Sequence, residues 1–402
     1  MRGIRILFLT QICPYPPTNG GAIKTFNILK HLGSAHDVRL LMFVRQEPDA
    51  ATLERLARHC REIGFCGIRR SAARNALDAA RSLWKRESFI ITRDFRPQMQ
   101  AKVLEALAET PFDLIYVDHL QMFQYVPGEA PCPVLLDEHN VEWQIIERFA
   151  VAGTALAQRA FASLEWRKLR ACELSACRRA DIVLTVTDLD RRTIALHGIP
   201  EGKISAVPIG VDVDMVRPVQ LSASSANVLT FGTMSWPPNA DAVEYFASEI
   251  YPRIKKEVPE ARFTVVGANP PPRIGALGAG DRSIQITGFV EDLREPASEA
   301  AAFVVPLRIG SGMRVKILDA MALGLPIVTT SIGCEGINVE SGKHALVADT
   351  PEEFAEAVVH LLRNPEDRRR FGAAGRALVE SVYTWPLVLS RLDRVLARVE
   401  RL

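Results

Sequence analysis

The sequence lacks a surplus of charge of either sign. It carries 49 Lys and Arg against 47 Asp and Glu, which leaves a net charge of only +2. A chain with this balance has no overall attraction for nucleic acid. Hydrophobic residues make up 48% of the chain and charged residues 24%, as in an ordinary globular protein. Because one core rarely serves more than about 300 residues, a chain of 402 residues is expected to form two domains.

Paired cysteines are also missing. The seven cysteines are scattered, odd in number and contain no CxxC pair. This pattern indicates reduced thiols rather than a disulfide framework or a zinc site. The cysteines are Cys13, Cys60, Cys66, Cys132, Cys172, Cys177 and Cys334.

Long apolar runs are absent as well. No run approaches the roughly 18 uninterrupted apolar residues of a membrane-spanning helix. The basic start MRGIRILFLTQI has too short an apolar run for a signal peptide and lacks a cleavage site. We therefore expect a cytoplasmic protein whose first apolar run is a strand.

Basic residues gather locally between Arg55 and Arg96. They are interleaved with apolar side chains that include Leu83 and Trp84. The segment is either a solvated helical face or a surface for peripheral contact with an anionic membrane. The second alternative would place the protein at the inner face of the membrane.

What the sequence does have is an alternation of short apolar runs and helical patterns. Such runs indicate buried parallel strands, and the helices between them indicate a doubly wound α/β fold. The expected strands are Ile4–Thr10, Val38–Val44, Phe112–Asp118, Pro133–His139 and Asp181–Thr187, and the expected helices are Ala22–Leu32, Ala51–Cys60, Ala72–Trp84, Gln98–Ala108 and Leu156–Arg179.

The alternation loosens after Val207 and restarts at Asn227. We place a first domain at residues 1–216, joined by a C-terminal helix at 385–402, and a second domain at residues 217–384. Two doubly wound domains in tandem are expected to face each other across a cleft at the carboxyl ends of their strands. The expected strands of the second domain are Asn227–Gly232, Ala261–Gly267, Ile284–Gly288, Ala301–Leu307 and Leu325–Thr330.

One stretch of the second domain, PLRIGSGMRVKILDAMALGLPIV, combines a Gly-rich turn with the start of a helix. Unpaired backbone amides and the helix dipole both favour an anion there. Arg308, Arg314 and Lys316 add positive charge, so a phosphorylated ligand is one interpretation. The alternative is a plain turn followed by a surface pair of Lys316 and Asp319.

The run GSGMRVKILDAMALGLPIVTT resembles the donor-binding signature of family 4 glycosyltransferases with the GT-B fold. PYPPTNGGAIKTFNILKHL, VPIGVDVDMVRP, FTVVG, ITGFVEDL and TWPLVLSRL resemble further segments of that family in the same order. DHLQM, DEHNVEW and GTMSWPPNADAVEYF resemble its sugar transferases from PEP-CTERM exopolysaccharide systems. The resemblance implies two Rossmann-like domains and transfer of a sugar from a nucleotide diphosphate sugar, with retention of configuration, to a saccharide or lipid-linked acceptor.

The resemblance also implies roles for residues of the second domain. Arg308 and Lys316 would neutralise the leaving diphosphate, and Asp319 would bind the nucleotide ribose. The sequence departs from the family where Ser311 replaces a glutamate, and where GTMSWPPNADA lacks the usual Arg and Lys. We therefore expect Arg308 and Lys316 to act in place of that pair. The remaining donor-binding candidates are Thr233, Phe289, Val290, Gly310, Ser311, Gly312 and Met313.

In the first domain the resemblance points to two glycines and to polar residues at strand ends. The amides of Gly20 and Gly21 would face the donor diphosphate or the acceptor. His119 would polarise the acceptor or touch the transferred sugar, and we count it with Arg308 and Lys316 as catalytic. His139 and Asn140 are acceptor-side candidates. For each of these residues a structural role is the alternative.

No cofactor or metal is expected. Asp212-Val-Asp214 looks like the metal-binding DxD of the other glycosyltransferase fold, but it lies in the expected linker. A nucleotide-sugar epimerase or hydrolase on the same scaffold stays an alternative. So does a noncatalytic nucleotide-sugar-binding partner in polysaccharide assembly.

Overall fold

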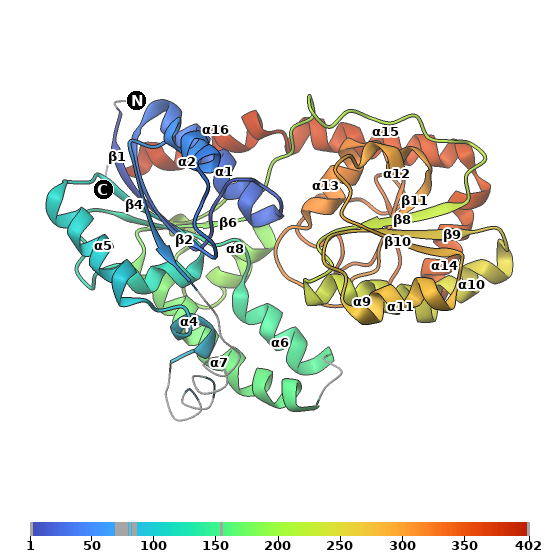
Figure 1. Ribbon diagram of the computed structural model, residues 1–402, viewed down its shortest axis with the longest axis horizontal. Coiled ribbons are helices and arrows are strands. Elements are labelled where there is room, and N and C mark those ends of the chain that lie inside the picture. Colours follow the sequence, from blue (N-terminus) through green and yellow to red (C-terminus); the bar gives the residue numbers. More distant parts are fainter. Residues whose placement is uncertain (1–2, 69–78, 80–81, 83–86, 153–155, 400–402) are drawn as a thin grey trace. The chain divides into compact units, whose positions relative to one another are not determined.

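The N-terminal part of the chain forms a sheet of seven parallel strands. In this computed structural model, which describes residues 3–68, 79, 82, 87–152 and 156–399, the strand order is β3-β2-β1-β4-β5-β6-β7 (Figure 1). The strands are β1 (Arg5–Thr10), β2 (Asp37–Val44), β3 (Glu62–Gly67), β4 (Leu114–Asp118), β5 (Val134–Asp137), β6 (Ile182–Thr185) and β7 (Ile204–Ala206). The five predicted strands of this part are confirmed as β1, β2, β4, β5 and β6.

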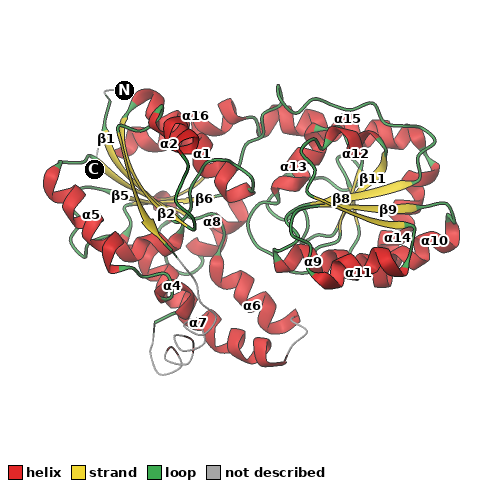
Figure 2. Cartoon of the chain, in the orientation of Figure 1, coloured by secondary structure: helices red, strands yellow, loops and turns green. Residues whose placement is uncertain are grey.

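Helices connect these strands and lie on both sides of the sheet, with α1 and α2 on one side and α5 and α7 on the other (Figure 2). Helix α1 begins where the Asn19 side chain accepts a hydrogen bond from the N–H of Ala22 at 3.1 Å. The predicted helix at 72–84 lies outside the described residues, apart from residues 79 and 82. The helices are α1 (Gly20–Ala35), α2 (Ala50–Ala57), α4 (Phe89–Thr92), α5 (Pro97–Glu109), η1 (Leu120–Tyr125), α6 (Glu142–Ala152), α7 (Leu156–Arg179), α8 (Asp188–Ala195) and η2 (Glu201–Lys203).

The C-terminal part repeats the architecture with a six-stranded parallel sheet in the order β10-β9-β8-β11-β12-β13. The strands are β8 (Asn227–Phe231), β9 (Arg262–Val266), β10 (Ile284–Gly288), β11 (Ala300–Val305), β12 (Ile327–Thr329) and β13 (Leu346–Val347). The helices are α9 (Pro237–Tyr245), η3 (Phe246–Ile250), α10 (Tyr251–Glu257), α11 (Pro272–Gly280), α12 (Arg294–Ser298), α13 (Val315–Ala322), α14 (Pro351–Arg363), α15 (Pro365–Val382) and α16 (Trp385–Val399).

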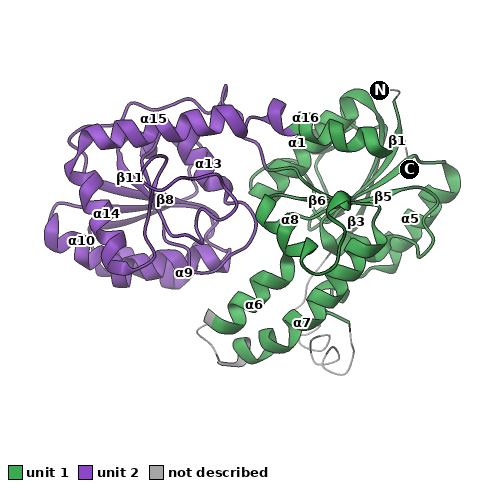
Figure 3. Cartoon of the chain, turned by 180° about the vertical axis from the view of Figure 1, so that it is seen from behind, with its two compact units in different colours: residues 1–208, 389–402 green, residues 209–388 purple. Residues whose placement is uncertain are grey.

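The chain folds into two compact units (Figure 3). Unit 1 comprises Met1–Pro208 and Leu389–Leu402, and unit 2 comprises Ile209–Val388. Each unit has a core of buried aliphatic and aromatic side chains, which include Leu7 and Ile115 in unit 1 and Phe246 and Phe263 in unit 2. The predicted doubly wound α/β architecture is confirmed in both units.

Each sheet has one point at which the strand order reverses. In unit 1 this switch point lies between β1 and β4, and in unit 2 between β8 and β11. In open α/β sheets, ligands bind outside the carboxyl ends of the strands at such points. The two switch points are therefore the expected positions of ligand-binding sites.

Candidate functional site

The carboxyl edge of the unit 1 sheet carries a row of buried polar residues. The strand register places Thr10 beside Asp118 and Asp118 beside Asp137, at the ends of β1, β4 and β5. All three side chains are fully buried. Asp137 is paired with the buried Lys24 of α1 and accepts a hydrogen bond from the Tyr116 hydroxyl at 2.6 Å. The negative charge of Asp137 is therefore compensated within the fold.

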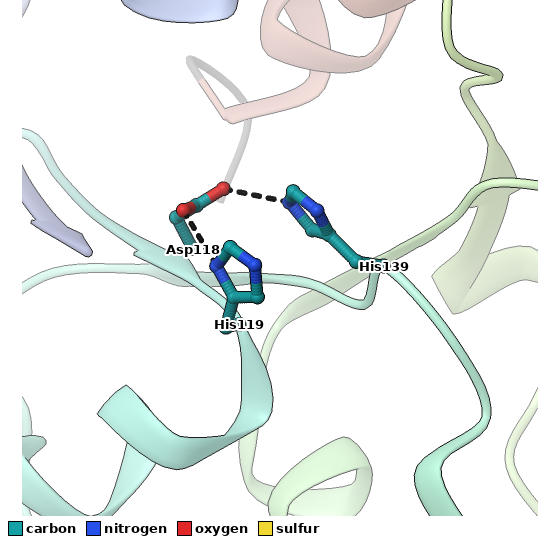
Figure 4. A group of neighbouring side chains, drawn as sticks. All are labelled: Asp118, His119 and His139. Carbon is teal, nitrogen blue, oxygen red and sulfur yellow. Dashed lines mark hydrogen bonds and ion pairs between the residues drawn. The ribbon is translucent and has the colours of Figure 1, made fainter. Parts of the chain in front are cut away.

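Asp118 is the centre of a second network, at the switch point itself. Its Oδ2 accepts hydrogen bonds from the Thr10 hydroxyl at 2.7 Å and from Nδ1 of His119 at 2.7 Å, and lies 2.9 Å from the Thr25 hydroxyl. Its Oδ1 accepts from Nε2 of His139 at 2.8 Å. Figure 4 shows the carboxylate beside the two imidazoles, with one hydrogen bond to each ring. Both oxygens of Asp118 are thus engaged.

The backbone of His119 adopts an uncommon conformation, with φ 73° and ψ 140°. A bulky residue in this region costs of order 1–3 kcal/mol and persists only where surrounding contacts fix it. With this backbone conformation the His119 side chain lies against Asp118, and 15% of it stays exposed. Its Nε2 atom faces α1, because a Cβ atom built on Gly21 would lie 3.5 Å from it.

The two histidines differ in the direction of their pKa shifts. Burial lowers the pKa of His119, but the adjacent Asp118 carboxylate raises it by more, so the net pKa is above the ordinary value. Burial, and then the charges of His119 and Lys24, lower the pKa of His139 to about 4. Burial would raise the pKa of Asp118, but the two imidazoles hold it well below its usual value. The site therefore holds an ionised carboxylate with one readily protonated histidine and one neutral histidine.

The other unit 1 candidates lie nearby. Gly20 and Gly21 form the first turn of α1, where amides have no partner within the helix. Asn140 follows His139 in the chain, and its side chain forms a hydrogen bond with Glu142 at the start of α6. The structure thus brings His119, His139 and Gly21 together, while Asn140 is bonded to α6.

At the unit 2 switch point, Lys316 is the main cation. Its Nζ donates a hydrogen bond to Oδ1 of Asn239 at 2.7 Å, and Nδ2 of Asn239 donates to the carbonyl of Thr233 at 2.9 Å. Glycine suits position 232, because its φ of 153° is rare for other residues and a Cβ atom there would lie 2.9 Å from the Lys316 ammonium. The network ties the loop after β8 to the start of α13.

Lys316 and Asp319 both titrate far from their ordinary range. Burial, and then the nearby charge of Arg314, lower the pKa of Lys316 to about 7. Burial raises the pKa of Asp319 to about 7. Both residues are half-buried, which argues against the alternative of an exposed surface pair.

Arg314 has turned into the Gly-rich loop rather than outward. Its guanidinium donates hydrogen bonds to the carbonyls of Ser311 and Gly312 and, at 3.3 Å, to that of Ile332. It also lies 3.8 Å from Glu335. The positive charge that we expected Arg314 to add for a ligand is used to hold the loop.

This inward arginine orients the loop amides. The C=O of one residue and the N–H of the next belong to the same planar trans peptide and point in opposite directions. Because the carbonyls of Ser311 and Gly312 face the guanidinium, the N–H groups of Gly312 and Met313 point away from it. A Cβ atom at Gly310 would lie 2.4 Å from the guanidinium, which explains the glycine there.

Arg308 lies at the surface, 44% exposed. It forms a two-point ion pair with Asp241 of α9, at 2.6 and 3.1 Å, and its guanidinium lies 4.4 Å from the centre of the Tyr245 ring. These contacts use two of the five N–H donors of the guanidinium and hold Arg308 against α9.

The remaining candidates occupy loops. Phe289 is 72% exposed directly after β10, and Val290 is partly buried beside it. The Ser311 side chain is buried in the loop that Arg314 holds. Asp212 accepts hydrogen bonds from the backbone N–H groups of Asp214 and Met215, so this carboxylate closes a local turn.

Sequence reasoning missed Asp118, Asn239 and the fixing role of Arg314. Asp118 directly precedes His119, at the last position of a predicted strand, and this strand-end placement was an available signal. Asn239 offered a weaker one, because it stands several residues beyond its strand in the PPN segment. Its contact with Lys316 joins positions far apart in the chain, which no local pattern reveals.

The basic segment of unit 1 is only partly described. Arg58 pairs with Glu54 and Arg61 with Asp37, and the buried Arg96 donates to backbone carbonyls. Residues 69–78, 80–81 and 83–86 of the segment lie outside the described residues, so the expected membrane contact stays a prediction. Across the described ranges, no helix is both long and apolar enough to cross a bilayer.

Two family models match consecutive parts of the chain. The model described as Glycosyltransferase Family 4 matches residues 18–215, and the model described as Glycosyl transferases group 1 matches residues 225–364. Together they span strands β2 to β7 of unit 1 and all six strands of the unit 2 sheet. The chain therefore belongs to the family 4 glycosyltransferases, as the sequence resemblance indicated, and it is an enzyme of the glycosyltransferase class.

Individual proteins agree with this assignment. A 44.6 kDa protein in the cps region of Klebsiella pneumoniae is 20% identical over 404 residues, covering 96% of this chain and 98% of its own. A GDP-mannose-dependent phosphatidylinositol monomannoside mannosyltransferase of Mycobacterium tuberculosis is 27% identical over 237 residues, covering 53% of this chain and 60% of its own. The crystal structure of Anabaena HepE in complex with UDP and glucose superposes with a TM-score of 0.69 at 14% identity, covering 98% of this chain and 99% of its own, which confirms the GT-B fold.

Proposed function

We propose that this glycosyltransferase moves a sugar from a nucleotide diphosphate sugar to an acceptor hydroxyl during the assembly of an exopolysaccharide or another surface glycan. The environment of Lys316 is the observation that best supports this proposal. Lys316 is a shielded ammonium at a sheet switch point, held by the neutral amide of Asn239 rather than by a carboxylate. An uncompensated cation in such a place suits an anionic ligand.

The demanding part of the reaction is the charge that collects on the leaving diphosphate. Lys316 and the outward N–H groups of Gly312 and Met313 would stabilise that charge, and preorganised donors in a shielded site each contribute about a hundredfold to a thousandfold in rate. Asp319 would accept hydrogen bonds from the ribose hydroxyls. Phe289, exposed beside the end of β10, supplies an apolar surface for the base.

The unit 1 switch point would serve the acceptor and the transferred sugar. His119 presents an imidazole nitrogen beside the first turn of α1, where it can polarise a hydroxyl. Retention of configuration and independence from metal are parts of the proposal that follow from the family. The relative in a cps region and the relative that acts on a lipid-linked mannoside both suit a surface-glycan acceptor.

The first test is a thermal-shift screen of the purified protein against UDP, GDP and ADP and their common sugar conjugates. HepE has been crystallised with UDP, and the mycobacterial relative uses GDP-mannose, so uridine and guanosine nucleotides come first. A ligand at a hundred times its dissociation constant stabilises the fold by about 2.7 kcal/mol. We expect one base to give this shift and its sugar conjugate to support transfer, with and without EDTA.

The screen separates the alternatives. Turnover of the donor with no acceptor present would favour the epimerase or hydrolase. Tight nucleotide binding without turnover on any acceptor would favour the noncatalytic partner. No shift with any nucleotide would contradict the proposal.

A further inference from the structure

We propose that Asp118 is a positioning residue that holds His119 and His139 in opposite tautomers, so that His119 presents Nε2 to the reactants while His139 remains a neutral support. The inference rests on the proposed function, because His119 has a catalytic role only if the protein transfers a sugar. It concerns three residues that meet at one point of the fold (Figure 4).

The tautomers follow from the hydrogen-bond geometry. An ionised carboxylate can only accept hydrogen bonds. Each imidazole atom that faces Asp118 must therefore carry a proton, which is Nδ1 in His119 at 2.7 Å and Nε2 in His139 at 2.8 Å. In the neutral form of His119, the Nε2 atom is then left as an acceptor.

The carboxylate is well suited to remain ionised. Asp118 is fully buried, and it receives the Thr10 hydroxyl in addition to the two imidazoles. Hydrogen bonds to the charged form and adjacent positive charge both favour ionisation. The same interactions fix the carboxylate plane, and with it the orientation of both rings.

The two histidines have different protonation states because their rings are too close for both to be charged. Their centres lie 3.8 Å apart, and their planes are 24° from parallel. The charged groups that act on this pair of rings are Asp118 and Asp137 at the strand ends and Glu142 of α6, and Lys24 of α1, which acts on His139. A proton on one ring therefore disfavours a proton on the other, and the shielded His139 is the ring that stays neutral.

Three observations select His119 as the ring that meets the reactants. It keeps 15% of its side chain exposed, whereas the His139 side chain keeps 5%. It alone of the two has the strained positive φ. Its Nε2 faces the first turn of α1, where a Cβ atom at Gly21 would lie 3.5 Å away, in ordinary contact.

A metal centre is the competing interpretation of the same three residues. Their ligand atoms all lie within 4.8 Å of one another, and within the described residues they are the group with that spacing. Against a metal, both carboxylate oxygens and one nitrogen of each ring are already used in mutual hydrogen bonds. A bound cation would have to displace those contacts, so we favour the hydrogen-bonded arrangement.

The test replaces Asp118 with asparagine. The Asp118→Asn amide has one acceptor and one donor end, so it can bond only one of the two facing N–H groups, and the other ring must change tautomer or turn away. We expect transfer at saturating donor to fall about a hundredfold or more, with nucleotide affinity unchanged because the nucleotide site lies in unit 2. Thr10→Val is the matched control, since it removes a hydrogen bond to the same carboxylate but leaves both tautomers, and it should lose only about a few-fold.

Ring ¹⁵N NMR of histidine-labelled protein supplies a readout independent of activity. The spectrum of the wild-type protein should show Nδ1–H for His119 and Nε2–H for His139, assigned with His119→Gln and His139→Gln, and the Asp118→Asn variant should lose that pattern. Wild-type tautomers that differ from these would overturn the inference, and so would an Asp118→Asn variant that keeps full transfer. A histidine spectrum that responds to one equivalent of Zn²⁺, with activity abolished by EDTA, would establish the metal centre instead. If the tautomers are as expected but no donor supports transfer, the proposed function fails and the positioning of His119 stands.

Discussion

The two switch points occupy the same place in two similar sheets, yet they treat charge in opposite ways. In unit 1, the carboxylates of Asp118 and Asp137 are compensated by histidines and by Lys24. In unit 2, Lys316 is held by a neutral amide, and burial raises the pKa of Asp319. The first arrangement presents a readily protonated imidazole whose charge is balanced by a carboxylate, which suits a hydroxyl group. The second leaves positive charge for a diphosphate.

The strain is distributed differently as well. In unit 1 the residue proposed to contact the reactants, His119, itself has a positive φ. In unit 2, where Asn269 after β9 also has a positive φ, the loops before α9 and α13 place their unusual backbone angles on glycines, with φ 153° at Gly232 and 74° at Gly312. A side chain fixed by strain suits precise orientation, whereas glycines let the backbone and Lys316 approach closely. The comparison predicts different consequences of substitution in the two units.

The largest effect is expected at Lys316. Lys316→Met keeps much of the stem volume but removes the charge, so transfer should fall about a hundredfold to a thousandfold. The measurement is kcat at saturating donor, with a melting curve to show that the fold is intact. Arg308→Ala is the matched comparison, because Arg308 is exposed and already paired with Asp241, and it should lose less. Similar losses in the two variants would restore Arg308 as an equal partner of the diphosphate clamp.

The two histidines provide the next contrast. His119→Gln should lower transfer about a hundredfold, the range for loss of a positioned acid or base. His139→Gln should retain most activity, since its amide can still donate to Asp118 in place of Nε2. Transfer is measured separately from donor hydrolysis in both variants. A larger loss at His139 than at His119 would reverse the roles that we give them.

The sequence anticipated the architecture better than the sites. Ten short apolar runs predicted ten strands, because buried parallel strands are continuously hydrophobic. Strand β3 was missed because EIGFCG is half-buried and contains two glycines, and β7 and β13 because they have only three and two residues. Helix α6 was missed because the DEHNVEW segment follows directly on a strand and resembles its end.

The site residues were predictable where chemistry follows a strand end or a Gly-rich turn. His119, Gly21 and Lys316 meet this condition, and the structure places them at the two switch points. Contacts between distant segments were not predictable, since the pairing of Arg308 with Asp241 and of Lys316 with Asn239 depends on how α9 packs. The inward turn of Arg314 likewise depends on the path of the loop around it.

Asn239 tests whether the unit 2 cation needs its support. Asn239→Leu has a similar size but cannot accept the hydrogen bond from Lys316, so the ammonium loses its fixed position. We expect kcat to fall about tenfold, which corresponds to loss of one hydrogen bond to a charged group. Asn239→Asp is the informative companion, because its carboxylate would keep Lys316 in place but cancel its charge. Equal activity in all three proteins would show that Lys316 is positioned by other contacts.

The pH dependence of donor binding offers a finer distinction. In the free protein Lys316 has a pKa of about 7, so it loses its charge as the pH rises above that value. Diphosphate binding favours the charged form, and nucleotide affinity should therefore fall by up to about tenfold per pH unit above pH 7. Lys316→Arg should bind with little dependence in the same range, because arginine stays protonated. Titration calorimetry in buffers of different ionisation enthalpy would detect the proton taken up by the wild type alone.

The smallest effect concerns stability, which should depend on pH in opposite directions for Asp319 and Lys316. The native pKa of Asp319 is about 7, above its unfolded value of about 3.9, so the folded state binds the extra proton and stability falls as the pH rises from about 4 to 7. Asp319→Asn removes that penalty and should raise the melting temperature by about 2–4 °C at pH 8, but by less at pH 4.

For Lys316 the native pKa lies below the unfolded value of about 10.4, so the free energy of unfolding rises between pH 7 and 10. Lys316→Met should therefore stabilise the fold most below pH 7. Opposite pH trends in the two variants would show that both groups are kept for ligand binding at the expense of the fold, whereas unchanged melting curves would mean that both groups are well hydrated.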